Sequence, residues 1–141
     1  MTRIFWDSML FIYLFQEDPA HWERVASLRR QSVERGDELC TSYLALAEIL
    51  TGAYRDKDDA TAQHIRDGMA KANIKFLPFD LSSVDLFARI RTEHRTAAAD
   101  SIHLACAASY GVDLFITEDK KLRKLRIPGI KFIVGIDTEL F

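Results

Sequence analysis

Four acidic residues occupy positions where folding alone would not place a charge. Asp7 directly follows a short apolar run, and Asp119 comes just after another. Glu48 interrupts the apolar residues of a helical stripe, and Asp100 follows three alanines at the start of a very apolar segment. A buried carboxylate is costly unless a cation pairs with it or binds to it. Four carboxylates in such settings therefore indicate a shared cation.

The residue types favour a hard divalent cation. Carboxylate oxygens suit Mg²⁺ or Mn²⁺ better than Zn²⁺, and no Cys/His spacing offers a zinc site. The two cysteines, Cys40 and Cys106, sit inside apolar segments, so we expect buried free thiols and no disulfide framework. His103 lies three residues after Asp100, where a supporting or packing role is a better explanation than ligation of a metal.

Each acid also has an explanation that involves no metal. Asp100 is suited to an N-cap or to the first turn of a helix, where the helix dipole stabilises it. Asp119 is a common type of turn residue, and Glu48 fits the solvent-facing edge of its stripe. Asp7 is the hardest to explain in this way, because a strand-to-helix turn in a parallel sheet lies at the edge where ligands bind.

The elements that must position these acids alternate between short apolar runs and longer helical patterns, which is typical of βαβ units. The expected strands are 3–6, 39–41, 74–77, 114–116 and 130–136, the last of them at an edge of the sheet. The expected helices are 9–15, Pro19 to Gly36, one capped by Ser42, 58–72, one capped by Ser82 or Ser83, and 100–110. We predict a three-layer α/β/α sandwich, with a mainly parallel sheet of four or five strands, in a single domain of residues 1–141.

Apolar spacing also predicts which side of each helix is buried. The shared faces are Trp22, Val25 and Ala26; Leu46, Ile49, Leu50 and Ala53; and Val84, Phe87 and Ala88. The segment 100–110 is apolar and small nearly all round, so it belongs in the interior. Four large residues of the early helices are suited either to the core or to an interface: Phe11, Tyr13, Phe15 and Trp22.

The bulk composition is that of one ordinary globular domain, with 141 residues, 48% of them hydrophobic and 28% charged. Asp7 interrupts the apolar run from Phe5 to Phe15, so neither a signal peptide nor a membrane span is expected. We therefore expect a soluble, cytoplasmic protein. The net charge of −2 gives no overall basic signal for nucleic acid, although basic residues can still cluster locally.

Four short motifs, in this order along the chain, resemble the pattern of the PIN-domain family. They are residues 4–8 (IFWDS), 47–52 (AEILTG), 99–107 (ADSIHLACA) and 114–119 (LFITED). The resemblance covers essentially the whole chain, and the spacings are similar to those of compact prokaryotic members. A receiver-like or haloacid-dehalogenase-like protein is a poorer match, since the latter needs Asp-x-Asp where this chain has Asp7-Ser8-Met9.

The resemblance also implies roles for individual residues. Asp7, Glu48, Asp100 and Asp119 match the acidic metal-site positions of the family. Ser8 and Thr117 match positions where small hydroxyl residues support the site, whereas Met9 stands where the family often has asparagine. Glu118 competes with Asp119 for the fourth position, and the Thr-x-Asp spacing favours Asp119.

The function that the resemblance implies is a Mg²⁺- or Mn²⁺-dependent endoribonuclease. Within the family, the length and the lack of added domains suggest a VapC-type toxin, which commonly forms a homodimer and is neutralised by a small antitoxin protein. Two alternatives stay open: a non-toxic PIN-domain nuclease in RNA processing, and a catalytically silent interaction module on the same fold.

Basic residues flank two of the acids and are candidates for binding the RNA backbone. One group follows Asp119 directly and comprises Lys120, Lys121, Arg123, Lys124 and Arg126; the other precedes Asp100 and comprises Arg91, His94 and Arg95. On charge alone, a solvated surface helix explains the first group slightly better. No aromatic motif for stacking RNA bases stands out.

Overall fold

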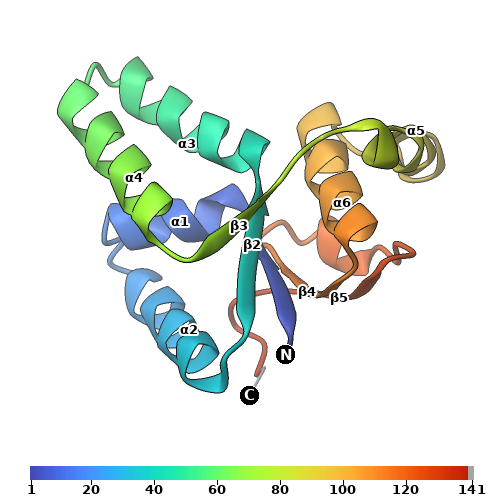
Figure 1. Cartoon of the computed structure of the whole chain (residues 1–141), viewed down its shortest axis with the longest axis horizontal. Helices are drawn as coiled ribbons and strands as arrows, with labels where there is room; N and C mark the ends of the chain where they lie inside the picture. The colour runs from blue at the N-terminus through green and yellow to red at the C-terminus, as the bar shows by residue number, and fades with distance from the viewer. Residues whose placement is uncertain (140–141) are drawn as a thin grey trace.

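The computed structural model describes residues 1–139 as a parallel sheet with helices on both faces (Figure 1). The strands are β1 (Arg3–Trp6), β2 (Glu38–Ser42), β3 (Ile74–Leu77), β4 (Val112–Ile116) and β5 (Ile130–Val134). The helices are α1 (Ser8–Phe15), α2 (Trp22–Arg35), α3 (Tyr43–Arg55), α4 (Asp59–Lys71), α5 (Leu81–His94) and α6 (Ala98–Tyr110), with a short 3₁₀ turn, η1 (Leu122–Lys124).

The five strands lie in the order β3-β2-β1-β4-β5, and every neighbouring pair is parallel. The predicted three-layer sandwich is therefore confirmed, including the edge position of the last strand. The chain winds outward from β1 to β3 on one side, then returns to place β4 on the other side of β1. The winding thus reverses between β1 and β4, and in open α/β sheets ligands bind beyond the strand ends at such a point.

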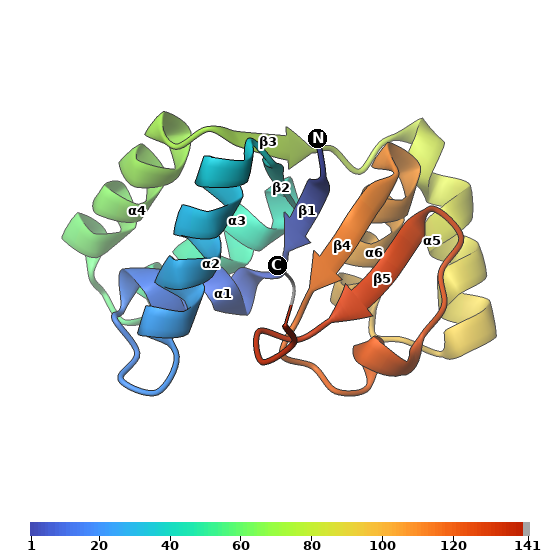
Figure 2. The same ribbon diagram turned by 90° about the horizontal axis from the view of Figure 1, so that it is seen from below.

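The helices divide into two layers, with α1 to α4 on one face of the sheet and α5 and α6 on the other (Figure 2). Neighbouring residues of β1 alternate between the faces, so Ile4 and Trp6 pack beneath α1 to α4 while Phe5 packs beneath α6. Phe5 and its partner in β4, Phe115, stack with ring centroids 4.6 Å apart. This contact joins the two strands at which the winding reverses.

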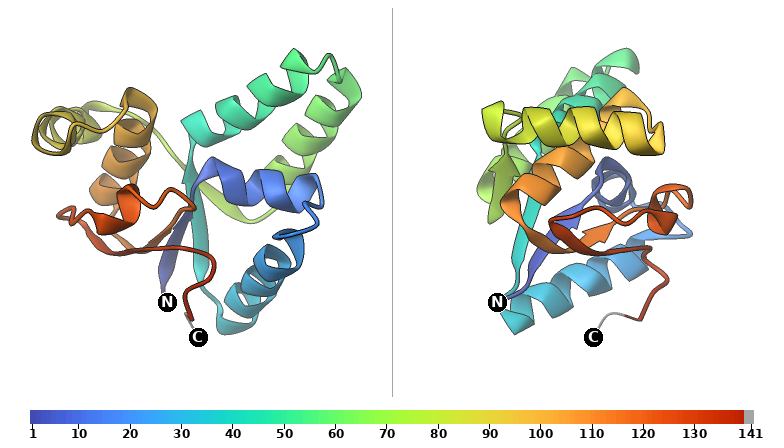
Figure 3. Two further views of the ribbon diagram at one scale, coloured as in Figure 1. Left: turned by 180° about the vertical axis from the view of Figure 1, so that it is seen from behind. Right: turned by 90° about the vertical axis from the view of Figure 1, so that its right-hand side faces the viewer.

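Helix α6 lies directly on the sheet, and α5 packs against α6 (Figure 3). Six consecutive residues of α6, from His103 to Ala108, are buried, which confirms the predicted interior helix. Gly111 ends α6 in the left-handed conformation, with φ of 83°. Cys40 and Cys106 are free and buried, as expected, and burial raises the pKa of their thiols to about 12 and about 11.

The start of α2 differs from the prediction. Pro19 lies in a turn, and the helix begins at Trp22, whose side chain is 36% exposed. Val25 is buried, as predicted, and Leu28 and Ser32 complete the buried face of α2. Phe11 is a core residue, and Tyr13 and Phe15 are partly buried against the same core cluster.

The predicted cap and inner face of α5 are also partly wrong. Asp80 caps the helix, and Ser83 completes a capping box by accepting a hydrogen bond from the Asp80 N–H at 2.9 Å. This start sets the phase of the helix, so Val84 and Ala88 are exposed. The inward side chains, spaced at i, i+3, i+4 and i+7, are Ser83, Leu86, Phe87 and Ile90.

No helix within residues 1–139 has the length and apolar character needed to cross a membrane.

Candidate active site

Asp7 lies at the point where the winding of the sheet reverses. It follows β1 directly and caps α1, its Oδ1 accepting a hydrogen bond from the Ser8 N–H at 2.8 Å. Its own N–H donates to the carbonyl oxygen of Ile116 at the end of β4. The side chain is largely buried, with the residue 9% exposed. Ser8 contacts Asp7 through its backbone N–H.

Thr117 connects two of the predicted acids. Its hydroxyl donates to Asp7 Oδ2 at 2.8 Å and accepts from the Asp119 N–H at 3.1 Å. The residue is fully buried, and its N–H is bonded to Val134 at the end of β5. These contacts fix Asp7 and the backbone of Asp119 at the carboxyl ends of β1, β4 and β5.

Glu48 is held by a partner on another helix. The Nε2 atom of His103, on α6, lies 2.6 Å from Glu48 Oε1, and its Nδ1 lies 2.7 Å from Ser42 Oγ. Ser42 in turn caps α3 by accepting from the Ala45 N–H. His103 is 2% exposed, whereas the Glu48 side chain is 37% exposed. His103 therefore holds the carboxylate of Glu48 from the buried side and leaves part of the Glu48 side chain accessible to solvent.

Asp100 lies in the first turn of α6, one turn before His103, and is electrostatically coupled to the other acids. Burial raises the pKa of its carboxyl group, and the charges of Asp7, Asp119 and Glu48 raise it further, while His103 opposes the shift. Like charges raise the pKa of a carboxyl group in this way only when they lie close to it. The structure thus brings all four predicted acids to the same region.

Three of these four carboxylates, all but that of Glu48, have no cationic side chain at ion-pair distance within residues 1–139. Within residues 1–139, no lysine, arginine or histidine nitrogen lies within 4.0 Å of a carboxylate oxygen of Asp7, Asp100 or Asp119. The same residues include no group of three or more His, Cys, Asp or Glu side chains already gathered at metal-binding distances. The donor set nevertheless fits a hard divalent cation, because the carboxylates repel one another and no cation within residues 1–139 pairs directly with Asp7, Asp100 or Asp119.

Glu118 and Asp119 have different surroundings. Glu118 Oε1 accepts hydrogen bonds from Arg123 at 3.1 Å and from the Ile136 N–H at 3.2 Å, so it is tied to the end of β5. Asp119 is exposed, accepts only from the Lys121 N–H through its side chain, and contributes to the raised pKa of Asp100. The geometry therefore favours Asp119 as the fourth acid.

The predicted RNA-binding residues fall into three groups. Arg123 is already engaged by Glu118, by Asp137 and by the carbonyl oxygen of Thr117. The other cations of its segment are exposed: Lys120, Lys121, Lys124 and Arg126. Only residues 122–124 of this segment are helical, in the 3₁₀ turn η1, so it is not the longer surface helix considered above.

The third group comes from the end of α5. Arg91 is exposed in its last turn, and Arg95 caps the helix in the left-handed conformation, with φ of 54°. Arg95 lies three residues before the start of α6, the helix that carries Asp100. Sequence analysis identified these cations, but it did not identify Ser42 as the partner of His103, since 61 residues separate the two.

Comparisons with known proteins agree with this geometry. The family model of the PIN domain matches residues 4–128, a range that contains all four acids. No curated protein matches the chain. The fold is similar to that of VapBC2 from Rickettsia felis, solved bound to a DNA fragment from their promoter, with a TM-score of 0.74 and 16% identity over 95% of this chain and 98% of that chain.

Two further solved structures have the same fold. VapBC-1 from nontypeable Haemophilus influenzae gives a TM-score of 0.67 at 16% identity, covering 89% of this chain and 96% of that chain. VapBC-5 from Mycobacterium tuberculosis, of the VapBC family of toxin–antitoxin systems, gives 0.66 at 19% identity, covering 96% and 99%. The resemblance predicted from four motifs is confirmed, and the chain belongs to the PIN-domain family.

Proposed function

We propose that this protein is a metal-dependent endoribonuclease of the VapC type. The observation that carries the proposal is the set of carboxylates at the reversal point of the sheet, where Asp7, Asp119 and Glu48 raise the pKa of Asp100. Within residues 1–139, no lysine, arginine or histidine nitrogen lies within 4.0 Å of a carboxylate oxygen of Asp7, Asp100 or Asp119. Such an arrangement is unfavourable by itself and becomes favourable when a divalent cation is bound. Membership of the PIN-domain family supports a nuclease as the class of enzyme.

Asp7, Glu48, Asp100 and Asp119 are the residues that would hold Mg²⁺ or Mn²⁺. When bound, such a cation supplies positive charge that lowers the pKa of water and stabilises charge on a phosphodiester. The chain's own contribution is orientation. Thr117 and the Ser8 N–H fix the two oxygens of Asp7, and His103 fixes Glu48, so little rearrangement is needed when substrate arrives.

RNA is the proposed substrate, bound by its phosphates. Lys120 and Lys121 follow Asp119 directly, and Arg91 and Arg95 lie close in sequence to the start of α6. Contacts from such cations position a nucleic acid backbone without reading its sequence. They would also offset the repulsion between the acids and the phosphates.

A small antitoxin is the proposed protein partner, together with a second copy of this chain. The support is the fold shared with VapBC proteins, one of which, VapBC-5, is described as a member of a family of toxin–antitoxin systems. An arginine of the antitoxin would pair with the carboxylates of Asp7, Asp100 or Asp119 and so compete with the metal. A non-toxic RNA-processing nuclease and a silent interaction module are the alternatives that the experiments must separate.

Incubation of the purified protein with a mixed RNA pool and Mn²⁺ or Mg²⁺ tests the nuclease. We expect cleavage that EDTA abolishes, that Asp7→Asn abolishes, and that Asp67→Asn, a change on the exposed side of α4, leaves intact. Equal cleavage by Asp7→Asn would contradict the proposed site. Absence of both cleavage and Mn²⁺ binding in calorimetry would favour the silent module, whereas Mn²⁺ binding without cleavage would indicate a narrow RNA target or a bound inhibitor. Growth arrest on expression, absent for Asp7→Asn, separates a toxin from a processing enzyme.

A further inference from the structure

The segment after Asp119 has a charge unlike that of the chain as a whole. Between Asp119 and Asp137 there is no acidic residue, yet the segment contains six of the chain's 19 lysine and arginine side chains. The whole chain has a net charge of −2. Positive charge is therefore concentrated along η1, the following loop and β5, at one edge of the sheet.

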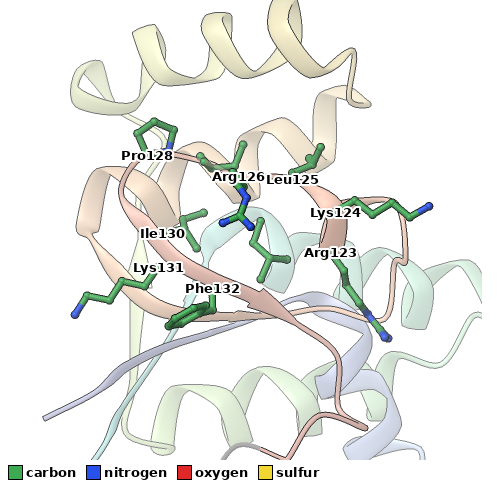
Figure 4. Close-up of a pocket in the computed structure, with 10 residues that line it drawn as sticks. Arg123, Lys124, Leu125, Arg126, Pro128, Ile130, Lys131 and Phe132 are labelled. Carbon is green, nitrogen blue, oxygen red and sulfur yellow. The ribbon is translucent and has the colours of Figure 1, made fainter.

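A cavity of about 460 Å³ lies along this edge, between residues 123–128 and β5 (Figure 4). Arg126 extends into the space between the loop and the strand, whereas Lys124 and Lys131 project outward at its two ends. Ile127 and Ile130 are buried in its wall. The cavity is thus an open groove lined by cationic side chains, with buried isoleucines in its wall.

The cations of this groove differ in their availability. Arg123 is paired with Glu118 and Asp137, and Lys131 Nζ lies 2.9 Å from an oxygen of Asp113. In contrast, within residues 1–139 no carboxylate oxygen lies within 4.0 Å of the charged groups of Lys124 or Arg126, and both residues are exposed. Two positive charges are therefore free to bind an external anion.

Phe132 adds an aromatic surface to these charges. It is 64% exposed on the edge strand β5, which makes it the most exposed aromatic side chain among residues 1–139. Little of its apolar surface is buried by folding, so packing does not account for it. Phe132 lines the same cavity as Lys124 and Arg126. An exposed ring and unpaired cations are the two elements with which proteins bind single-stranded nucleic acid, stacking on bases and pairing with phosphates.

The groove adjoins the acidic residues. Val134, at the end of β5, accepts a hydrogen bond from the Thr117 N–H at 2.9 Å, and the carbonyl oxygen of Asp119 accepts from Leu122 at 3.1 Å. A strand of RNA that passes the acids can therefore continue along β5. Five residues of parallel strand extend about 16 Å, the length of roughly three nucleotides of extended single strand.

We propose that Lys124, Arg126 and Phe132, which we call the β5 edge site, bind single-stranded RNA beyond the point of cleavage. Lys124 and Arg126 contact phosphates, and one base stacks on the ring of Phe132. The identity of the ligand rests on the proposed nuclease function. The site gives the protein a preference for unpaired RNA, since a base within a duplex does not offer its face to the ring.

The test is the affinity of the full chain for an unstructured, fluorescein-labelled oligoribonucleotide, measured in EDTA at several salt concentrations. We expect Phe132→Ala to weaken binding about tenfold and Phe132→Tyr to bind like the wild type. The double variant Lys124→Gln/Arg126→Gln should bind more weakly and lower the salt slope by about 1.4, because each lost phosphate contact removes about 0.7 from it. Tyr54→Ala and Arg30→Gln/Lys71→Gln, in exposed residues of other helices, serve as controls.

Each other outcome overturns the proposal. Unchanged affinity of both edge-site variants shows that the groove does not bind RNA. Weaker binding by the double variant alone reduces the site to a charged surface without base stacking. Competition by polyglutamate as effective as that by RNA indicates an acidic protein segment, and loss of self-association in both variants indicates a second copy. Cleavage by the wild type with Mn²⁺ is scored separately, so the nuclease and the edge site can fail independently.

Discussion

The hydroxyl of Thr117 donates a hydrogen bond to Asp7 across the boundary between β4 and β1, 110 residues apart in the chain. The same oxygen accepts from the Asp119 N–H, so one buried side chain orients two acids. Thr117 is itself fully buried, so its hydroxyl is shielded from solvent.

Thr117→Val should therefore impair both stability and catalysis. It leaves Asp7 Oδ2 and the Asp119 N–H without this partner, a loss of about 1–3 kcal/mol in the free energy of unfolding. Cleavage should fall about 10- to 100-fold, as for lost supporting contacts at metal sites. Thr117→Ser keeps the hydroxyl and should retain most activity. Thr92→Val, on the exposed face of α5, is the control, and equal effects of both valine variants in denaturation and cleavage assays would contradict the assignment.

His103→Leu should separate folding from function. The leucine fills the buried site, and Ser42 can still cap α3 through the Ala45 N–H, but Glu48 loses the partner at 2.6 Å. We expect a folded protein whose maximal rate falls about 10- to 100-fold, with a smaller change in KM. His103→Gln, which can still donate to Glu48, should recover part of the rate. A change in KM alone would argue against a positioning role. A maximal rate no lower than that of the exposed control, His64→Gln, would also argue against it.

Asp100→Asn should stabilise the metal-free protein while abolishing cleavage. Because the pKa of Asp100 is raised in the folded state, the folded protein binds this proton more tightly than the unfolded chain does. Ionisation therefore lowers the free energy of unfolding as the pH rises from 3.8 through the raised value. In EDTA, the variant should melt at a higher temperature than the wild type near pH 7, and the difference should vanish toward pH 3.8.

Added Mn²⁺ should reverse that order of stability. A ligand at 100 times its dissociation constant stabilises the folded state by about 2.7 kcal/mol, and only the wild type keeps the full set of carboxylates. A melting temperature of the wild type that Mn²⁺ does not raise would contradict a metal site here.

Glu118→Gln and Asp119→Asn should have opposite effects: the first mainly on stability, the second mainly on cleavage. Glu118 binds Arg123 and the Ile136 N–H, so its loss should destabilise the protein by about 1–2 kcal/mol and change cleavage little. The Asp119 side chain is exposed and accepts one hydrogen bond, from the Lys121 N–H, so Asp119→Asn should change the melting temperature little and reduce cleavage at least 100-fold. The reverse pattern would assign Glu118 to the site.

Local sequence patterns were sufficient to predict most of the fold, and they also single out the four acids as candidates for the site. Strands such as Arg3–Trp6 are short apolar runs, and each acid follows or interrupts an apolar run, which can be recognised without long-range information. The inner face of α5 could not be predicted correctly, because the capping box at Asp80 and Ser83 sets the helix phase and Val84 and Ala88 carry the same apolar signal as a buried pair.

Contacts between distant residues were the other gap. His103 was expected to support the site, but its bonds to Ser42 and Glu48 depend on how α6 and α3 approach each other across the edge of the sheet. Likewise, the run of cations after Asp119 looks uniform in sequence. Only the fold separates Arg123, which is bound by Glu118, from Lys124 and Arg126, which are free of such pairs in residues 1–139.

The return of β4 to the side of β1 determines when during synthesis the proposed site can form. A nascent chain emerges from its N-terminus, so β1, β2 and β3 are available before the strand that completes the centre of the sheet. Until residues 112–119 have emerged, Asp7 lacks its hydrogen bond from the hydroxyl of Thr117, and Asp119 is absent from the site. Prematurely terminated chains should therefore lack the proposed nuclease activity, which is expected only of chains synthesised nearly to their end.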